Sequence, residues 1–120
     1  MAHQRLGEYA TASGSAMCMA VRAGDQIFIG GLAGSAPGDP AAQAEQAMRN
    51  VQRLLEQAGG GLQHIRKLTT YLTDRAWEDE AQAVVARHLG GSAPARIVVL
   101  VAGLASPEAL VQIDVDAVLS

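Results

Sequence analysis

The chain has 120 residues, of which 49% are hydrophobic, 18% charged and only 3% aromatic, and its formal net charge is −3. This balance is typical of a folded chain with one core, and we expect residues 1–120 to form a single domain. A nucleic-acid surface needs clustered positive charge and several aromatic rings, which this composition does not supply. Because no apolar run approaches the roughly 18 residues of a membrane helix, we also expect no membrane contact.

Cysteine and histidine usage narrows the class further. Cys18 is the only cysteine, which excludes an internal disulfide and is typical of a reducing cytoplasm, where we expect the protein to lie. His3, His64 and His88 are far apart and do not have the spacing of metal ligands, so the sequence predicts no metal site. A short chain with 13 glycines and a small aliphatic core is only marginally stable alone, which favours association of subunits.

The first forty residues predict a β-hairpin between two irregular segments. Residues 1–16 are polar and small, and they predict either a loop or an edge strand. Apolar residues 17–21 and 26–29 flank a turn that contains Gly24, which is the pattern of two antiparallel strands. We expect Gly30 and Gly31 to end the second strand, and the following residues as far as 40 to form a loop.

Two amphipathic helices are predicted next. Asp39 can cap the first helix and Pro40 suits its first turn, after which apolar side chains recur every three or four residues. These apolar positions are Ala44, Met48, Val51, Leu55 and Ala58. The second helix begins at Asp74, carries acidic residues in its first turn, and ends before Gly90.

Three further strands complete the pattern. Residues 64–73 are β-prone, and residues 97–101 form a continuous apolar run that predicts a strand buried on both faces. Residues 110–118 alternate between apolar and polar side chains, which predicts a half-buried strand. The order β-β-α-β-α-β-β predicts an α+β fold with two helices on one face of a mixed sheet. The opposite face would be partly apolar and uncovered, and its simplest cover is another copy of the chain.

Few residues suggest a chemical role by themselves. Arg96 lies directly before an apolar strand, where a guanidinium can bind a carboxylate or pair with a local acid. Gln112, Asp114 and Asp116 share one face of the last strand, where two carboxylates suit acid–base chemistry or simply form a solvated face. Cys18 has no basic neighbour in the sequence, which is typical of an inert buried thiol.

Five segments together resemble one known family. They are the hairpin AGDQIFIGG at residues 23–31, the helix segment EQAMRNV at 45–51, the strand IRKLTTYLTD at 65–74, the tripeptide PAR at 94–96 and the ending LVQID at 110–114. They occur in order and with natural spacing between residues 21 and 118. On this pattern the chain is identified as a divergent member of the RidA/YjgF/YER057c/UK114 family, also described as endoribonuclease L-PSP-like proteins and reactive-intermediate deaminases.

The resemblance implies a fold, an assembly and a reaction. It implies a chorismate-mutase-like fold assembled as a homotrimer, with three clefts between subunits. Family members hydrolyse reactive enamine and imine acids, such as 2-aminoacrylate, to 2-oxo acids and ammonia. The arginine of the PAR tripeptide binds the substrate carboxylate, and this role carries over to Arg96. No cofactor is implied, because a protonated imine is already electrophilic and water attacks it directly.

Several positions depart from the deaminating members of the family. Residues 15–17 (Ser-Ala-Met) stand where those members carry Gly-Pro-Tyr, and Gly30 stands where they carry a serine. Ala81, Val98 and Gln112 stand where they carry an asparagine, a cysteine and a glutamate. An amide can orient a water molecule but cannot accept its proton, so the change at residue 112 alters the expected chemistry.

We therefore expect Arg96 and Gln112 to be the catalytic residues, with Arg96 binding the carboxylate and Gln112 orienting water. The residues expected to line the substrate site are Arg96, Met17, Gly30, Gly31 and Val98.

The leading hypothesis is a hydrolytic deaminase of enamine or imine acids. One alternative is a non-catalytic trimer that binds a small 2-oxo or short-chain acid in the same clefts. Another is a specialised catabolic or biosynthetic hydrolase with an altered substrate. A ribonuclease is disfavoured by the acidic charge and the few aromatic residues.

Overall fold

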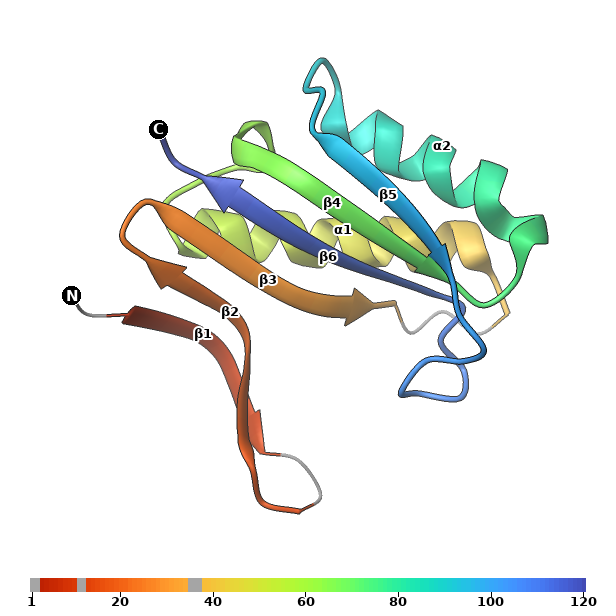
Figure 1. Cartoon of the computed structure of the whole chain (residues 1–120), viewed down its shortest axis with the longest axis horizontal. Coiled ribbons are helices and arrows are strands. Elements are labelled where there is room, and N and C mark those ends of the chain that lie inside the picture. Colours follow the sequence, from red (N-terminus) through yellow and green to blue (C-terminus); the bar gives the residue numbers. More distant parts are fainter. Residues whose placement is uncertain (1–2, 11–12, 35–37) are drawn as a thin grey trace.

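The computed structural model describes residues 3–10, 13–34 and 38–120, and Figure 1 shows how they are arranged. Within these residues, six strands form one mixed sheet in the order β1-β2-β3-β6-β4-β5; β4 and β5 run parallel and the other neighbours antiparallel. The strands are β1 (His3–Ala10), β2 (Ala16–Ala23), β3 (Gln26–Ala33), β4 (Ile65–Leu72), β5 (Ala95–Leu100) and β6 (Val111–Val118). The helices are α1 (Pro40–Gln57) and α2 (Glu78–Leu89), and short 3-10 turns, η1 (Leu62–His64) and η2 (Arg75–Trp77), precede β4 and α2.

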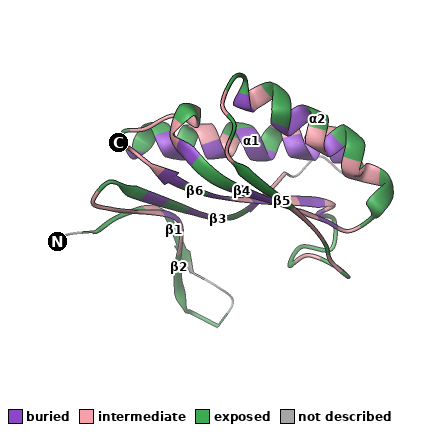
Figure 2. Cartoon of the chain, turned by 45° about the horizontal axis from the view of Figure 1, so that its top comes forward, coloured by how far each residue is buried: buried purple, intermediate pink, exposed green. Residues whose placement is uncertain are grey.

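Both helices cover the same face of the sheet, as Figures 1 and 2 show together. The predicted apolar stripe of α1 lies in the core, since Ala44, Met48, Val51 and Leu55 are fully buried and Ala58 is nearly so. Asp39 caps this helix, because its Oδ1 accepts a hydrogen bond of 3.1 Å from the backbone N–H of Ala42. The predicted α+β class, with two helices on one face of a mixed sheet, is therefore confirmed.

β6 lies at the centre of the sheet, between β3 and β4. Its predicted alternation is confirmed: Val111, Ile113, Val115 and Ala117 are at most 1% exposed and pack under the helices. The residues between them therefore point to the opposite face, which no helix of the described chain covers. We refer to this as the open face.

Residues 3–10 form an edge strand, which is one of the two states predicted for residues 1–16; residues 1–2 and 11–12 lie outside the described residues. β1 pairs along its length with β2, whereas β2 pairs with β3 only from Ala20 to Ala23. The end of this hairpin, residues 7–10 with 16–19, therefore extends beyond the rest of the sheet (Figure 1). We call β1 together with residues 16–19 of β2 the arm.

Two predicted strand features are wrong. β3 does not end at Gly30 and Gly31: its pairing with β6 becomes irregular after Ile29 and resumes at Leu32, so the glycines form a bulge inside the strand. The strand after residue 94 is not buried on both faces. Among the strands of the described residues, β5 lies at the sheet edge with β4 as its one neighbour, and Ile97 is 42% exposed. A continuous apolar run has the same sequence pattern in an interior strand and in an edge strand whose apolar side chains are not covered within the chain.

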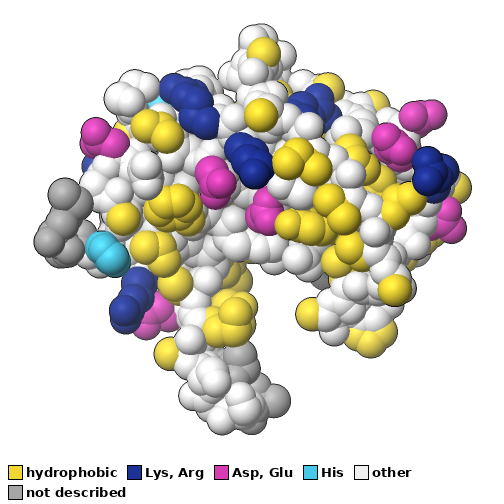
Figure 3. Space-filling view, in the orientation of Figure 1, with side chains coloured by type: hydrophobic (Ala, Val, Ile, Leu, Met, Phe, Trp, Pro, Cys, Tyr) yellow, Lys and Arg dark blue, Asp and Glu magenta, His cyan; other side chains and the backbone are white. Residues whose placement is uncertain are grey.

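The open face mixes apolar and charged side chains, as Figure 3 shows. Phe28 is 43% exposed there, opposite Asp116 in the strand register. The Tyr71 hydroxyl donates a hydrogen bond of 2.8 Å to Asp114 Oδ2. This hydrogen bond, together with partial burial and the carboxylate charge, raises the pKa of Tyr71 above its usual value. Among the described residues, no helix is long and apolar enough to cross a membrane.

A charged cluster joins the two helices on their outer side. Glu45 of α1 accepts hydrogen bonds from Arg49, at 3.0 Å, and from Arg87 of α2. His88 Nε2 lies 2.7 Å from the same carboxylate, and its side chain is only 13% exposed. Burial and the positive charges of Arg87 and Arg49 outweigh the attraction of Glu45 and lower the pKa of His88 below its usual value.

We predict that His88 makes folding stability depend on pH. The pKa of His88 is about 6.5 in the unfolded chain and lower in the folded protein. As pH falls below ~6.5, the unfolded state therefore binds more protons than the folded state. The contribution of His88 is therefore fully present above pH ~6.5 and is lost in more acidic solution. In thermal unfolding at about pH 7.5 and 5.5, His88→Gln should show a smaller drop in Tm than the wild type. Equal drops in the two proteins would contradict the assignment.

Candidate functional site

The main candidate site is a cavity of about 280 Å³ at one end of the sheet, between the arm and the loop that follows β5. Figure 3 shows the surface hollowed between these two projections. We call it the sheet-end pocket. Its lining residues are Tyr9, Met17, Cys18, Met19, Gly30, Gly31, Leu32, Ala105 and Gln112. Four predicted site residues therefore come together here: Met17, Gly30, Gly31 and Gln112.

The bulge in β3 fixes how Gln112 enters the pocket. Gln112 follows the buried Val111 on β6, so it points to the open face, where it is the register partner of Ala33 and Tyr71. Its side chain lies directly on the backbone of Gly31: a Cβ at residue 31 would be 2.6 Å from Gln112 Cδ and closer still to Nε2. Only a residue without a side chain leaves room for this contact.

A buried glutamine holds the backbone next to Gln112. Gln43 of α1 is fully buried, and its Oε1 accepts hydrogen bonds from the backbone N–H groups of Leu110, at 2.7 Å, and Val111, at 3.3 Å. Its Nε2 donates a hydrogen bond of 3.0 Å to the carbonyl of Glu108. The start of β6 is thereby tied to the core, which fixes the position from which Gln112 projects.

Arg96 and Val98 lie away from this pocket. Arg96 is the register partner of Leu68, which is fully buried under the helices, so its side chain leaves the sheet on the helix-covered side. Its Nη2 donates hydrogen bonds to Gln82 of α2, at 3.0 Å to Oε1 and 3.3 Å to the carbonyl oxygen. Val98 points the same way and packs against the core. A single chain thus presents Arg96 and Gln112 on opposite faces of the sheet.

Gln82 is a candidate site residue that sequence reasoning missed. The family's helix asparagine was expected at Ala81, but Ala81 is fully buried in the core. The next residue supplies the amide that contacts Arg96. The helical period is the signal that could have identified Gln82. Ala81 shares the apolar face of α2 with Val84 and Val85, so Gln82, the next residue, must lie at the rim of that face.

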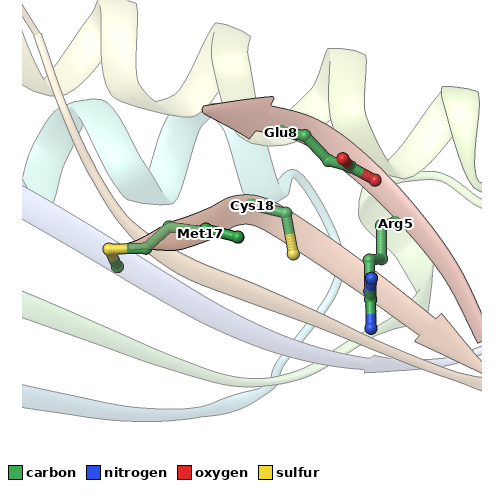
Figure 4. Close-up of a pocket in the computed structure, with 5 residues that line it drawn as sticks. Arg5, Glu8, Met17 and Cys18 are labelled. Atoms are coloured by element: carbon green, nitrogen blue, oxygen red, sulfur yellow. The ribbon is translucent and has the colours of Figure 1, made fainter. Parts of the chain in front are cut away.

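A second, smaller cavity of about 220 Å³ lies in the arm (Figure 4). Arg5 and Glu8 come to it from β1, and Ala16, Met17 and Cys18 from β2. Cys18 is half-buried and lines both cavities, so in the folded chain it has Arg5 and Glu8 nearby, which its sequence neighbours did not indicate.

The acidic residues of β6 do not reach either cavity. Asp114 accepts the hydrogen bond from Tyr71, and Asp116 is the register partner of Lys67 on the same face. These contacts favour a role in the surface of the open face. Among the residues that the structure describes, no group of three or more His, Cys, Asp or Glu side chains is arranged to hold a metal ion.

The fold places this chain in a class of small α+β chains with two helices on one face of a mixed sheet, and its pocket lies at the end of that sheet. The family model described as Endoribonuclease L-PSP matches residues 9–119. The chain therefore belongs to this family, which includes the RidA and YjgF/YER057c/UK114 proteins, as the sequence motifs predicted.

Individual relatives agree with this assignment. A RutC family protein from Pyrococcus horikoshii is 33% identical over 102 residues, covering 79% of this chain and 80% of the relative. The crystal structure of Rv2704 from Mycobacterium tuberculosis, of the YjgF/YER057c/UK114 family, is 30% identical, with a TM-score of 0.85 over 98% of this chain and 99% of that chain. RidA from the Antarctic bacterium Psychrobacter is also 30% identical, with a TM-score of 0.81 over 91% and 92%.

We predict that Gly31→Ala displaces the Gln112 side chain while the fold persists. The clash is with a side chain that can swing away, so we expect Tm to fall by no more than about 4 °C. The nuclear Overhauser contact between the Gln112 side-chain amide and residue 31 should be lost. Gly30→Ala is the matched control, because a Cβ there meets only the Met19 carbonyl at an ordinary 3.6 Å. Retention of the contact in Gly31→Ala would show that Gln112 does not lie where we place it.

Proposed function

We propose that the protein is a hydrolytic deaminase of enamine or imine acids, acting in a cleft that two copies of the chain form together. The observation that carries the proposal is the separation of Arg96 from Gln112. Arg96 is exposed at the β5 edge beside Gln82, whereas Gln112 lies in the sheet-end pocket on the other face. A substrate that contacts both needs the β5 edge of one copy against the pocket of another.

Each half of this cleft suits one part of the reaction. The Arg96 guanidinium can bind the substrate carboxylate through two parallel hydrogen bonds, and Gln82 Oε1 steadies it from the other side. The Gln112 carbonyl can accept a hydrogen bond from a water molecule above the imine carbon. Orientation and charge complementarity are then the main contributions of the protein.

The reaction is balanced without a cofactor. Water adds to the carbon of the protonated imine, and its proton passes to the nitrogen of the substrate, because Gln112 cannot accept it. The carbon–nitrogen bond then breaks, and the products are a 2-oxo acid and ammonium. No electron is transferred to or from the substrate.

The open face supports the assembly that this cleft requires. Phe28 and Ile97 are more than 40% exposed on a face that carries Lys67 next to Asp116, so it offers both apolar area and charges of each sign to another copy. We propose the homotrimer that the family resemblance implies, with three such clefts.

One feature favours a second candidate function. None of the described residues that line the sheet-end pocket is an Asp, Glu or His, so the pocket offers no ordinary general base. A protein that binds a 2-oxo acid without turning over an imine would need only Arg96 and a neutral pocket.

The first test is the loss of the carboxylate contact. A charge-assisted hydrogen bond contributes about 1.5–3 kcal/mol, so Arg96→Ala should lower kcat/KM for enamine acids generated in situ by about 10- to 100-fold. Ammonia release is measured, and Arg53→Ala, which removes an exposed arginine of α1, is the matched control. No rate above that in buffer would exclude the deaminase, and a fully active Arg96→Ala would exclude the role of Arg96. Stabilisation by 2-oxobutyrate without turnover would favour the binding protein.

The second test asks whether the site is shared between copies. The solution mass should be three times that of one chain. Arg96→Ala and Gln112→Ala should each be impaired, and mixed trimers refolded from equal amounts should regain about a quarter of the sites, because some clefts then combine two intact halves. A mass near one chain would refute the assembly, and failure of the mixture to regain activity would place both residues in one subunit's site.

A further inference from the structure

We propose that the smaller cavity in the arm, which we call the arm cavity, is a second binding site and that its ligand is a free α-amino acid in the zwitterionic form. The Arg5 guanidinium binds the carboxylate of this ligand, and the Glu8 carboxylate binds its ammonium group. The site contains neither Arg96 nor Gln112, so the inference does not depend on the proposed deaminase activity.

The two opposite charges of the arm cavity are the first observation. Arg5 and Glu8 both line it, yet within the described part of the chain neither side chain has a hydrogen-bond or ion-pair partner. Both residues are exposed, so water hydrates each charge. A zwitterion complements the two charges at once. An acid alone is repelled by Glu8 and an amine alone by Arg5, so the pair selects a ligand that carries both groups.

The backbone at Gly7 is the second observation. Arg5 and Glu8 are three residues apart on β1, and a regular strand would direct them to opposite faces. Gly7 lies between them with a φ of +65°, in the left-handed region that favours glycine, and the pairing of β1 with β2 omits it. Irregularities of this kind change the direction of neighbouring side chains, and here both charged residues come to the same cavity beside Cys18 (Figure 4).

The size and the remaining wall of the arm cavity are the third observation. Its volume of about 220 Å³ is roughly seven times the ~30 Å³ that one water molecule occupies in the liquid, which suits an amino acid with a small or medium-sized side chain. The wall from β2 consists of Ala16, Met17 and Cys18, which offer methyl, thioether and thiol groups. These groups are weakly polar, so the side chain of the ligand should be apolar. L-Valine is a suitable probe.

The experiment is a nuclear magnetic resonance titration of the full chain with L-valine. The reporters are the Arg5 Nε–H and the Cys18 backbone N–H, since both residues line the arm cavity and both signals should shift. Cys18 also lines the sheet-end pocket, whereas Arg5 does not, so the Arg5 signal assigns the site. The Arg96 Nε–H, which belongs to the proposed deaminase cleft, should stay in place.

Two analogues of valine test whether both charges are recognised. Isobutylamine lacks the carboxylate, and 3-methyl-2-oxobutanoate lacks the ammonium group. Each analogue loses one charge-assisted contact with an exposed partner, so each should bind in the arm cavity at least about fivefold more weakly than L-valine.

Variants of the two charged residues test the same contacts from the side of the protein. Arg5→Gln and Glu8→Gln should each weaken L-valine binding by at least about fivefold, as followed at Cys18. Both residues are exposed, so the fold tolerates the neutral side chains. Arg53→Gln on α1 and Glu80→Gln on α2 remove the same charges at exposed positions outside the cavity, and binding should be unchanged in these matched controls.

Several outcomes would overturn the inference. These are no shift of Arg5 with L-valine, unchanged binding in both Arg5→Gln and Glu8→Gln, or a shift of Arg96 in place of Arg5. Equal binding of 3-methyl-2-oxobutanoate and L-valine would show that the ammonium group is not recognised, which would overturn the zwitterionic class of ligand. None of these results bears on imine turnover, so this inference and the deaminase can fail separately.

Discussion

The alternation of side chains along β6 is the constraint on which the rest of this structure depends. Its four inward residues form the centre of the core under α1 and α2. A shift of one residue in the pairing with β3 or β4 would bury Gln112 and expose Val111 and Ile113, at a large cost in apolar area. The core therefore fixes both the register of the sheet and the face on which Gln112 appears. Gln43 adds a second restraint, since it binds the backbone just before that residue.

The same alternation at the sheet edge separates the two residues that the proposed reaction requires. β5 pairs with β4 so that Arg96 lies opposite the buried Leu68, on the helix side. No rearrangement of side chains within one chain can bring this guanidinium to a pocket on the other face. Oligomerisation would then be part of the construction of the site and would also cover apolar surface. The uncovered face and the proposed division of the site have one physical origin, which is a sheet with helices on only one side.

Much of the fold could be predicted from local patterns. The α1 stripe, the cap at Asp39 and the alternation of β6 each depend on neighbours within a few residues, so the sequence states them directly. The bulge at Gly30 and Gly31 could not be predicted, because glycine pairs end strands as readily as they interrupt them, and only the pairing of Leu32 with β6 distinguishes the two outcomes. The edge position of β5 was missed because an apolar run looks the same whether its cover is a helix or another subunit.

The candidate site was predicted less completely, because part of it depends on tertiary packing and not on local patterns. Met17, Gly30, Gly31 and Gln112 were expected to share a site and do line one pocket. Gln82 depends on the helical phase of α2 relative to β5, which is a tertiary property.

The arm gives the pocket an evolutionary freedom that the core lacks. Met19 packs against the core, but Tyr9 and Met17 remain half-exposed, so substitutions at residues 9 and 17 have little effect on the packing that stabilises the fold. One wall of the pocket can therefore diverge quickly, while the wall formed by β3 and β6 is held by the core. Related chains could acquire different ligands through changes in this hairpin alone, with Arg96 and the sheet left intact.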